Sequence, residues 1–183
     1  ATEACFHEEL YKLTTIDSLT GAFNRRHFDS CLSAEIGRAE RYGRCLTVGL
    51  VRIHELQDTT TDHGSERQQH ILRGCSSVMK SHLRQNDVVA RFTDEVFAII
   101  IPEVTPENAQ LACHKLLNAV KEQPFDYEGK TFSVGICLGT STASPTQNRR
   151  VHPEDLLAAA TTALEKAYAQ GPHQLVHEKL GEA

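Results

Sequence analysis

Apolar positions along the chain follow two patterns, one typical of helices and one typical of strands. Helical spacing, with an apolar residue every three or four positions, recurs in segments 3–14, 28–43, 71–83, 105–120 and 153–170. Nearly continuous apolar runs predict strands at 46–53, 88–92, 96–101 and 131–138, with a last short strand at 175–176.

The order of these segments indicates an α/β protein. Strands 88–92 and 96–101 are separated only by residues 93–95, a spacing typical of a β-hairpin. Thr105 is followed by proline and has the chemistry of a helix N-cap. Residues 141–150 are polar and predict a loop. We therefore expect a central, mostly antiparallel sheet flanked by helices.

Composition excludes some classes of partner. A length of 183 residues suits one domain with a full core. The formal net charge of -5 gives no basic field for nucleic acid, and no apolar run is long enough to span a membrane. The 6 cysteines are scattered without a Cys-x-x-Cys pair, so we expect buried thiols in a reducing, cytoplasmic compartment, with disulfides or zinc as the alternative.

Several motifs share the spacing of one known family. Residues 17–28 contain Asp-x-Leu-Thr-Gly-x-x-Asn-Arg-Arg-x-Phe, and residues 84–87 contain Arg-x-x-Asp shortly before the hairpin. The strands at 97–100 and 133–136 follow at the family's distances. In these motifs the chain resembles the GGDEF domain, the diguanylate cyclase family.

The resemblance implies a polymerase-palm-like nucleotidyl-cyclase fold and a role in bacterial second-messenger signalling. Active members join two GTP molecules into cyclic di-GMP. That reaction needs divalent cations, which neutralise phosphates and take hard oxygen ligands such as carboxylates.

The hairpin turn departs from the family pattern. The signature Gly-Gly-Asp/Glu-Glu-Phe aligns with residues 93–97. Thr93 and Asp94 place side chains where glycines would let the backbone approach a nucleotide. Glu95 keeps the metal-binding carboxylate, whereas Val96 replaces the adjacent glutamate.

A second departure lies at the end of the first strand. The family's metal-binding aspartate aligns with Arg52, whose guanidinium has only donors and a permanent positive charge. We predict that Arg52 pairs with Glu95 across neighbouring strands and occupies the place of the metal. The alternative is an Arg52 side chain that points into solvent.

Positions that contact GTP in the family have also changed. The residues implied to read the guanine edge align with Thr60 and Gln69, and the phosphate-binding cations align with Tyr168 and Pro172. Loss of metal, base and phosphate contacts predicts a protein that is not an enzyme and that uses no magnesium.

The Arg-x-x-Asp motif is retained. In the family this motif is an inhibitory site for cyclic di-GMP, where arginine binds guanine or phosphate in a planar fork. The resemblance therefore assigns cyclic di-GMP binding to Arg84 and Asp87, with Lys115 as a further basic residue. The alternative for Arg84 and Asp87 is a structural role at the end of a helix, and the alternative for Lys115 is a solvated side chain.

His54, His63 and His70 have no metal-ligand spacing and are interpreted as surface histidines.

We expect a linker helix at 1–14, a degenerate GGDEF domain at 15–178 and a tail at 179–183. The leading hypothesis is a cyclic di-GMP receptor that relays the messenger's level within a larger protein, as a homodimer or through another domain. The alternatives are a structural dimerisation or docking module and, less favoured, a residual cyclase.

Overall fold

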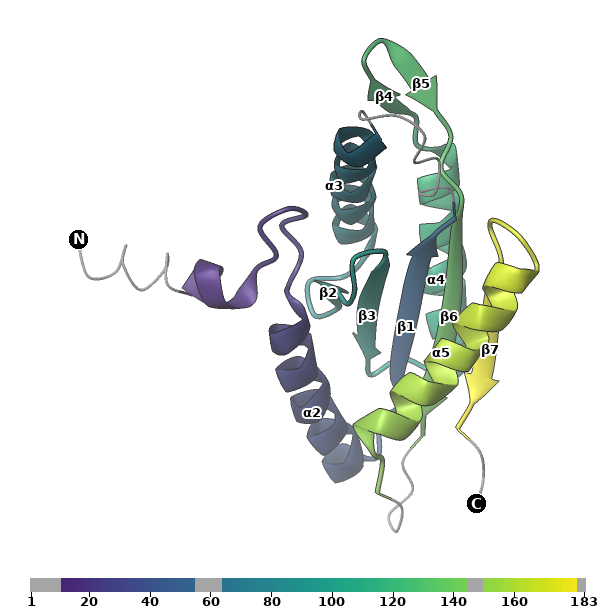
Figure 1. The fold of residues 1–183 in the computed structure, drawn as a ribbon. Helices are drawn as coiled ribbons and strands as arrows, with labels where there is room; N and C mark the ends of the chain where they lie inside the picture. The colour runs from purple at the N-terminus through teal and green to yellow at the C-terminus, as the bar shows by residue number, and fades with distance from the viewer. Residues whose placement is uncertain (1–10, 55–63, 145–149, 181–183) are drawn as a thin grey trace, which may run out of the picture.

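The computed structural model describes residues 11–54, 64–144 and 150–180, and it shows a twisted sheet with helices on both faces (Figure 1). The helices are α2 (Arg25–Tyr42), α3 (Gly64–His82), α4 (Pro106–Glu122) and α5 (Pro153–Ala169). The strands are β1 (Leu46–Ile53), β2 (Val88–Arg91), β3 (Val96–Pro102), β4 (Phe125–Tyr127), β5 (Lys130–Phe132), β6 (Ile136–Ala143) and β7 (Leu175–Lys179).

The main sheet has five strands in the order β2-β3-β1-β6-β7. The first four strands pair antiparallel, and β7 pairs parallel with β6 after the chain has crossed over in α5. The predicted α/β architecture with a mostly antiparallel sheet is confirmed.

β1 lies at the centre of the sheet and is buried on both faces. Val48 and Leu50 pack against α2 and α5, whereas Val51 and Ile53 pack against α3 and α4. Successive side chains of a strand point to opposite faces, so a strand covered on both sides needs apolar residues at almost every position. This double burial explains the continuous apolar run in the sequence.

The helix ends follow the local sequence chemistry. The side chain of Asn24 accepts a hydrogen bond from the backbone N–H of His27 at the start of α2. Gly43 ends this helix with a φ of 62°. Thr105 caps α4 as predicted, with its hydroxyl accepting from the N–H of Asn108.

Two sequence predictions in the second half of the chain, one of a strand and one of a loop, have the wrong residue bounds. The single strand expected at 131–138 is divided between β5, which pairs with β4 in a separate hairpin, and β6, which joins the main sheet. Gly135, between the two strands, packs so closely against Pro172 that a side chain would not fit there. The polar loop expected at 141–150 begins as the end of β6, where the hydroxyl of Thr142 shares a hydrogen bond with that of Thr47 at 2.7 Å.

The strand register places the two groups of predicted site residues at opposite ends of the sheet. Arg52, near the end of β1, lies opposite Val96 at the start of β3. Val88, directly after the Arg-x-x-Asp motif, lies opposite Ile100 near the end of β3. No helix among the described residues is long and apolar enough to cross a membrane. Most of the predicted linker helix lies outside the described residues, but residues 11–15 are helical.

Candidate functional site

Arg52 and Glu95 form the predicted ion pair. The Nη2 atom of Arg52 donates to Oε2 of Glu95 at 3.1 Å, across the β1–β3 pairing. Their side chains are 31% and 38% exposed, so water weakens the attraction between the charges. The guanidinium nevertheless neutralises the carboxylate for which the sequence resemblance implies metal binding.

An aromatic stack covers Arg52 from α5. The guanidinium carbon of Arg52 lies 4.2 Å from the ring centre of Tyr168. The ring of His54 stacks on the same tyrosine at 4.5 Å, with an interplanar angle of 28°. The interpretation of His54 as a surface histidine is therefore wrong, because its ring is partly buried and its Nε2 atom is enclosed by protein.

The wall behind this stack is also closely packed. A Cβ atom on Gly135 would lie 2.7 Å from Cβ of Pro172, the residue at the second altered phosphate position. The thiol of Cys137 donates to the carbonyl of Gly171 at 3.0 Å. Burial raises the pKa of Cys137, although the positive charge of Arg52 acts in the opposite direction. The space at the end of β1 therefore holds one cation, its carboxylate partner and packed rings.

The hairpin turn closes without the backbone freedom of glycine. The hydroxyl of Thr93 accepts a hydrogen bond from the N–H of Val96 at 3.2 Å. Neither Thr93 nor Asp94 is among the described residues with positive φ. Arg91 fixes the turn from outside by donating to the carbonyl of Asp94 at 2.9 Å.

Among the described residues, few groups near this turn could bind a hard cation. No group of three or more histidine, cysteine, aspartate or glutamate side chains in the described ranges is arranged to hold a metal. Gln69 lies partly buried on α3, while Thr60 and His63 fall outside the described residues.

The Arg-x-x-Asp motif forms a tight turn between α3 and β2. The carboxylate of Asp87 accepts from the N–H of Arg84 at 2.8 Å, and the N–H of Asp87 donates to the carbonyl of Arg84 at 3.0 Å. Burial raises the pKa of Asp87, while the Arg84 hydrogen bond and charge act to lower it. The carboxylate is thus partly desolvated and fixed in direction.

This turn forms one wall of an open groove of about 490 Å³. The other wall comes from α2 and from the end of β3. The groove is lined by Glu35, Arg38, Arg84, Gln85, Asn86, Asp87, Pro102 and Glu103. Ligand pockets commonly have volumes of about 300–1,000 Å³, so the groove is large enough for a small molecule.

Arg38 is a groove residue that no sequence motif predicted. Arg38 pairs with Glu35 at 2.7 Å, and its side chain is 66% exposed. Arg84 is also exposed and makes no ion pair with any described residue. Helical spacing alone cannot reveal that this part of α2 faces the Arg84 turn, because the approach is made by tertiary packing.

Lys115 lies apart from these two arginines. It is exposed on α4 and does not line the groove. Its predicted role in ligand binding stays a prediction.

The sequence pattern described as "Diguanylate cyclase, GGDEF domain" matches residues 14–174. The chain belongs to the GGDEF domain family. The match includes both ends of the sheet, with Arg52 and Glu95 at one end and the Arg84 turn at the other.

Relatives of this GGDEF domain include enzymes of cyclic di-GMP metabolism. The chain is 26% identical over 175 residues to the probable diguanylate cyclase DgcC of Escherichia coli K12, covering 93% of this chain and 45% of that protein. It thus spans about half the length of that relative.

Solved GGDEF structures share the fold. The FimX GGDEF domain from Pseudomonas aeruginosa has a TM-score of 0.81 at 23% identity, covering 90% of this chain and 99% of that one. The DgcB GGDEF domain from Caulobacter crescentus, in complex with c-di-GMP, has a TM-score of 0.81 at 18% identity, covering 89% and 92%.

Proposed function

We propose that this GGDEF domain does not synthesise cyclic di-GMP and instead binds it as a receptor, in the groove beside Arg84 and Asp87. The proposed lack of cyclic di-GMP synthesis rests on the presence of Arg52. A guanidinium at the implied metal position would repel divalent cations, and it already satisfies Glu95 at 3.1 Å. The Tyr168 and His54 rings then fill space next to it.

The proposed binding of cyclic di-GMP rests on the chemistry of the groove. A guanine base presents acceptors at O6 and N7 and donors at N1 and N2. Arg84 offers a planar set of donors without a competing ion pair among the described residues, and Asp87 offers a carboxylate acceptor. These two groups match the two edges of guanine.

The charge of the groove also suits a dinucleotide. Glu35 is paired with Arg38 at 2.7 Å, and Glu103 is paired with Arg44 at 2.5 Å. Two of the three carboxylates that line the groove, Glu35 and Glu103, are therefore neutralised by arginines. Arg38 is left with further N–H donors that can face a phosphate group.

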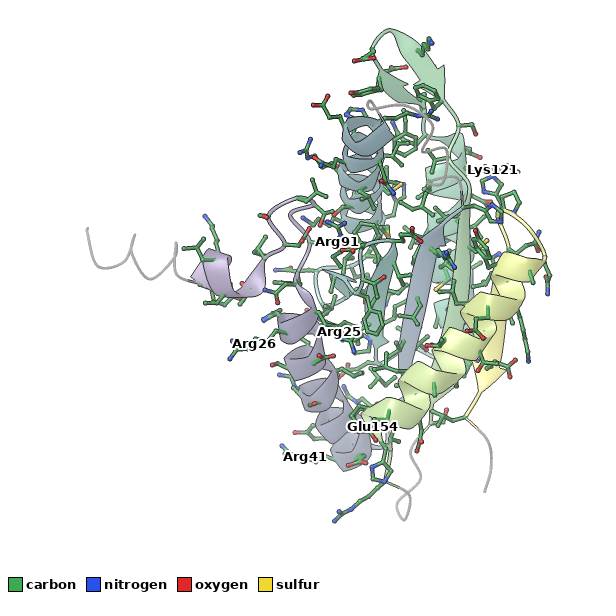
Figure 2. The ribbon with its side chains drawn as sticks, viewed as in Figure 1. Arg25, Arg26, Arg41, Arg91, Lys121 and Glu154 are labelled. Carbon is green, nitrogen blue, oxygen red and sulfur yellow. The ribbon has the colours of Figure 1, made fainter. Side chains whose placement is uncertain are left out.

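Calorimetry with cyclic di-GMP tests the receptor role. We expect binding by the wild-type domain and a loss of about 10- to 100-fold in affinity for Arg84→Ala, because hydrogen bonds to charged groups contribute about 1.5–3 kcal/mol. Arg26→Ala is the matched control, because Arg26 is an exposed arginine on the first turn of α2, outside the groove (Figure 2).

Absence of heat with the wild-type domain would contradict the receptor role and favour a structural dimerisation or docking module. Equal affinity in wild type and Arg84→Ala would place any binding elsewhere on the domain.

A further inference from the structure

An exposed aromatic ring lies on α2 one helical turn beyond the groove residue Arg38. Tyr42 is 61% exposed. It follows Glu35 and Arg38 at i+7 and i+4, so all three side chains lie on one face of the helix. Because Glu35 and Arg38 line the groove, this face leads from the groove to the tyrosine.

Two arginines surround the ring. The guanidinium carbons of Arg44 and Arg41 lie 5.6 Å and 6.0 Å from the ring centre. Arg44 also pairs with Glu103, which lines the groove. Figure 2 shows Arg41 projecting outward from the end of α2 that lies far from Arg25. Aromatic and guanidinium planes together form a surface on which a nucleobase can stack.

We infer that Tyr42, flanked by Arg41 and Arg44, is a stacking platform for a guanine base of cyclic di-GMP held in the groove. This inference rests on the proposed function and adds a determinant of specificity to the same site. One guanine contacts Arg84 and Asp87, a phosphate faces Arg38, and the other guanine stacks on Tyr42. Arg38 and Tyr42 are about one helical turn apart, roughly 6 Å along the axis, a span that one ribose can bridge.

This arrangement predicts a preference for ligands that combine a planar base with phosphate. A polar groove alone would bind phosphate with little regard to the attached group. The platform adds contact with the face of a base, which every nucleobase has, while Arg84 and Asp87 select guanine.

Calorimetry with cyclic di-GMP on Tyr42→Ala and Tyr42→Phe tests the platform. Stacking on an aromatic side chain contributes about 1–3 kcal/mol, so we expect Tyr42→Ala to weaken binding about tenfold or more. Tyr42→Phe keeps the ring and should bind within about twofold of wild type. Tyr11→Ala is the control, because Tyr11 is 53% exposed and lies outside the groove.

A spectroscopic measurement separates stacking from an indirect effect. The chain has 4 tyrosines, so carbon-13 labelling of tyrosine rings gives few signals, and Tyr42→Phe identifies the one from Tyr42. Cyclic di-GMP should shift this ring signal through the ring current of the stacked base.

The outcomes distinguish the platform from the receptor role. Wild-type binding that Arg84→Ala weakens but Tyr42→Ala leaves unchanged would overturn the platform alone. An unshifted Tyr42 signal at saturating ligand would overturn it as well. Absence of wild-type binding would reject the proposed receptor function, and the platform with it.

Discussion

Donors from two parts of the chain converge on the carboxylate of Asp17. The N–H and hydroxyl of Thr20 donate at 2.9 Å and 2.6 Å, and Arg91 donates at 3.5 Å. Burial acts to raise the pKa of Asp17, but these hydrogen bonds and the charge of Arg91 outweigh it and lower the pKa below its ordinary value. One carboxylate thus ties the segment before α2 to β2.

Asp17→Ala should lower the free energy of unfolding by about 2 kcal/mol at pH 7, since it removes charged hydrogen bonds. The folded-state pKa lies below the unfolded value. The stabilisation is therefore complete above the unfolded pKa of about 3.8 and is lost as pH falls through the folded pKa. Urea denaturation at several pH values should show wild type and variant converging in acid.

Asp29→Ala is the control for this effect. Asp29 pairs with Arg25 on the surface of α2, with 52% of its side chain exposed, so its removal should change stability by less than about 1 kcal/mol. A constant gap between wild type and Asp17→Ala from neutral to acid pH would contradict the role given to the carboxylate.

Turnover assays on the wild-type domain and on an Arg52 variant test the proposed lack of cyclic di-GMP synthesis. We expect no cyclic di-GMP from GTP and magnesium with the wild-type domain. Arg52→Asp restores a carboxylate at this position, but Tyr168 and Pro172 still lack the cationic groups that the resemblance implies for phosphate binding. We therefore expect no product from this variant either, measured by chromatography of the reaction mixture.

The variant must be shown to be folded, because its new carboxylate would face Glu95 and introduce repulsion between like charges. Circular dichroism provides that check. Product from the wild-type domain would show that Arg52 does not abolish turnover.

Between elements, β6 and α5 pack closely at Gly139. A Cβ atom on Gly139 would lie 2.0 Å from the backbone nitrogen of Leu164 and 2.5 Å from the carbonyl oxygen of Ala160. Backbone atoms cannot rotate away as a long side chain can, so the helix would have to move off the sheet. The position of Tyr168, one turn further along α5, depends on this contact.

Gly139→Ala should therefore lower the free energy of unfolding by about 3 kcal/mol or more, the upper range for overpacking. Gly37→Ala offers a matched control on α2, where nothing lies within 4 Å of the added methyl group. Alanine favours helix over glycine by about 1 kcal/mol, so this variant should be slightly more stable. Thermal unfolding of both variants measures the contrast, and equal melting temperatures would contradict it.

At the scale of the whole molecule, the sequence predicted the sheet flanked by helices. The apolar runs of β1 and β3 and the helical faces of α2 and α3 match the two clusters of buried residues. The spacing of apolar residues indicates which positions are buried. This spacing follows the period of each helix or strand and does not depend on which element packs against it. The Arg52–Glu95 pair was also predictable, because hairpin spacing and family alignment placed Arg52 on one strand and Glu95 directly before the adjoining strand.

Other features depend on how distant segments approach one another. The stack of Tyr168 on His54 and the presence of Arg38 in the groove arise where helices cross strand ends, and no local pattern encodes such crossings. The β4–β5 hairpin was missed because its strands are short and half exposed, with little alternation to reveal them.

The segment before α2 also covers the outer edge of β2. Phe23 accepts a hydrogen bond from the N–H of Arg91 and donates to the carbonyl of Val89, so it pairs along the outer side of β2. An uncovered strand at this position would present unpaired backbone groups, which can template intermolecular β-sheet. A chain shortened to begin at α2 would lack this cover. We expect such a chain to aggregate, while the groove beside Arg84 stays formed.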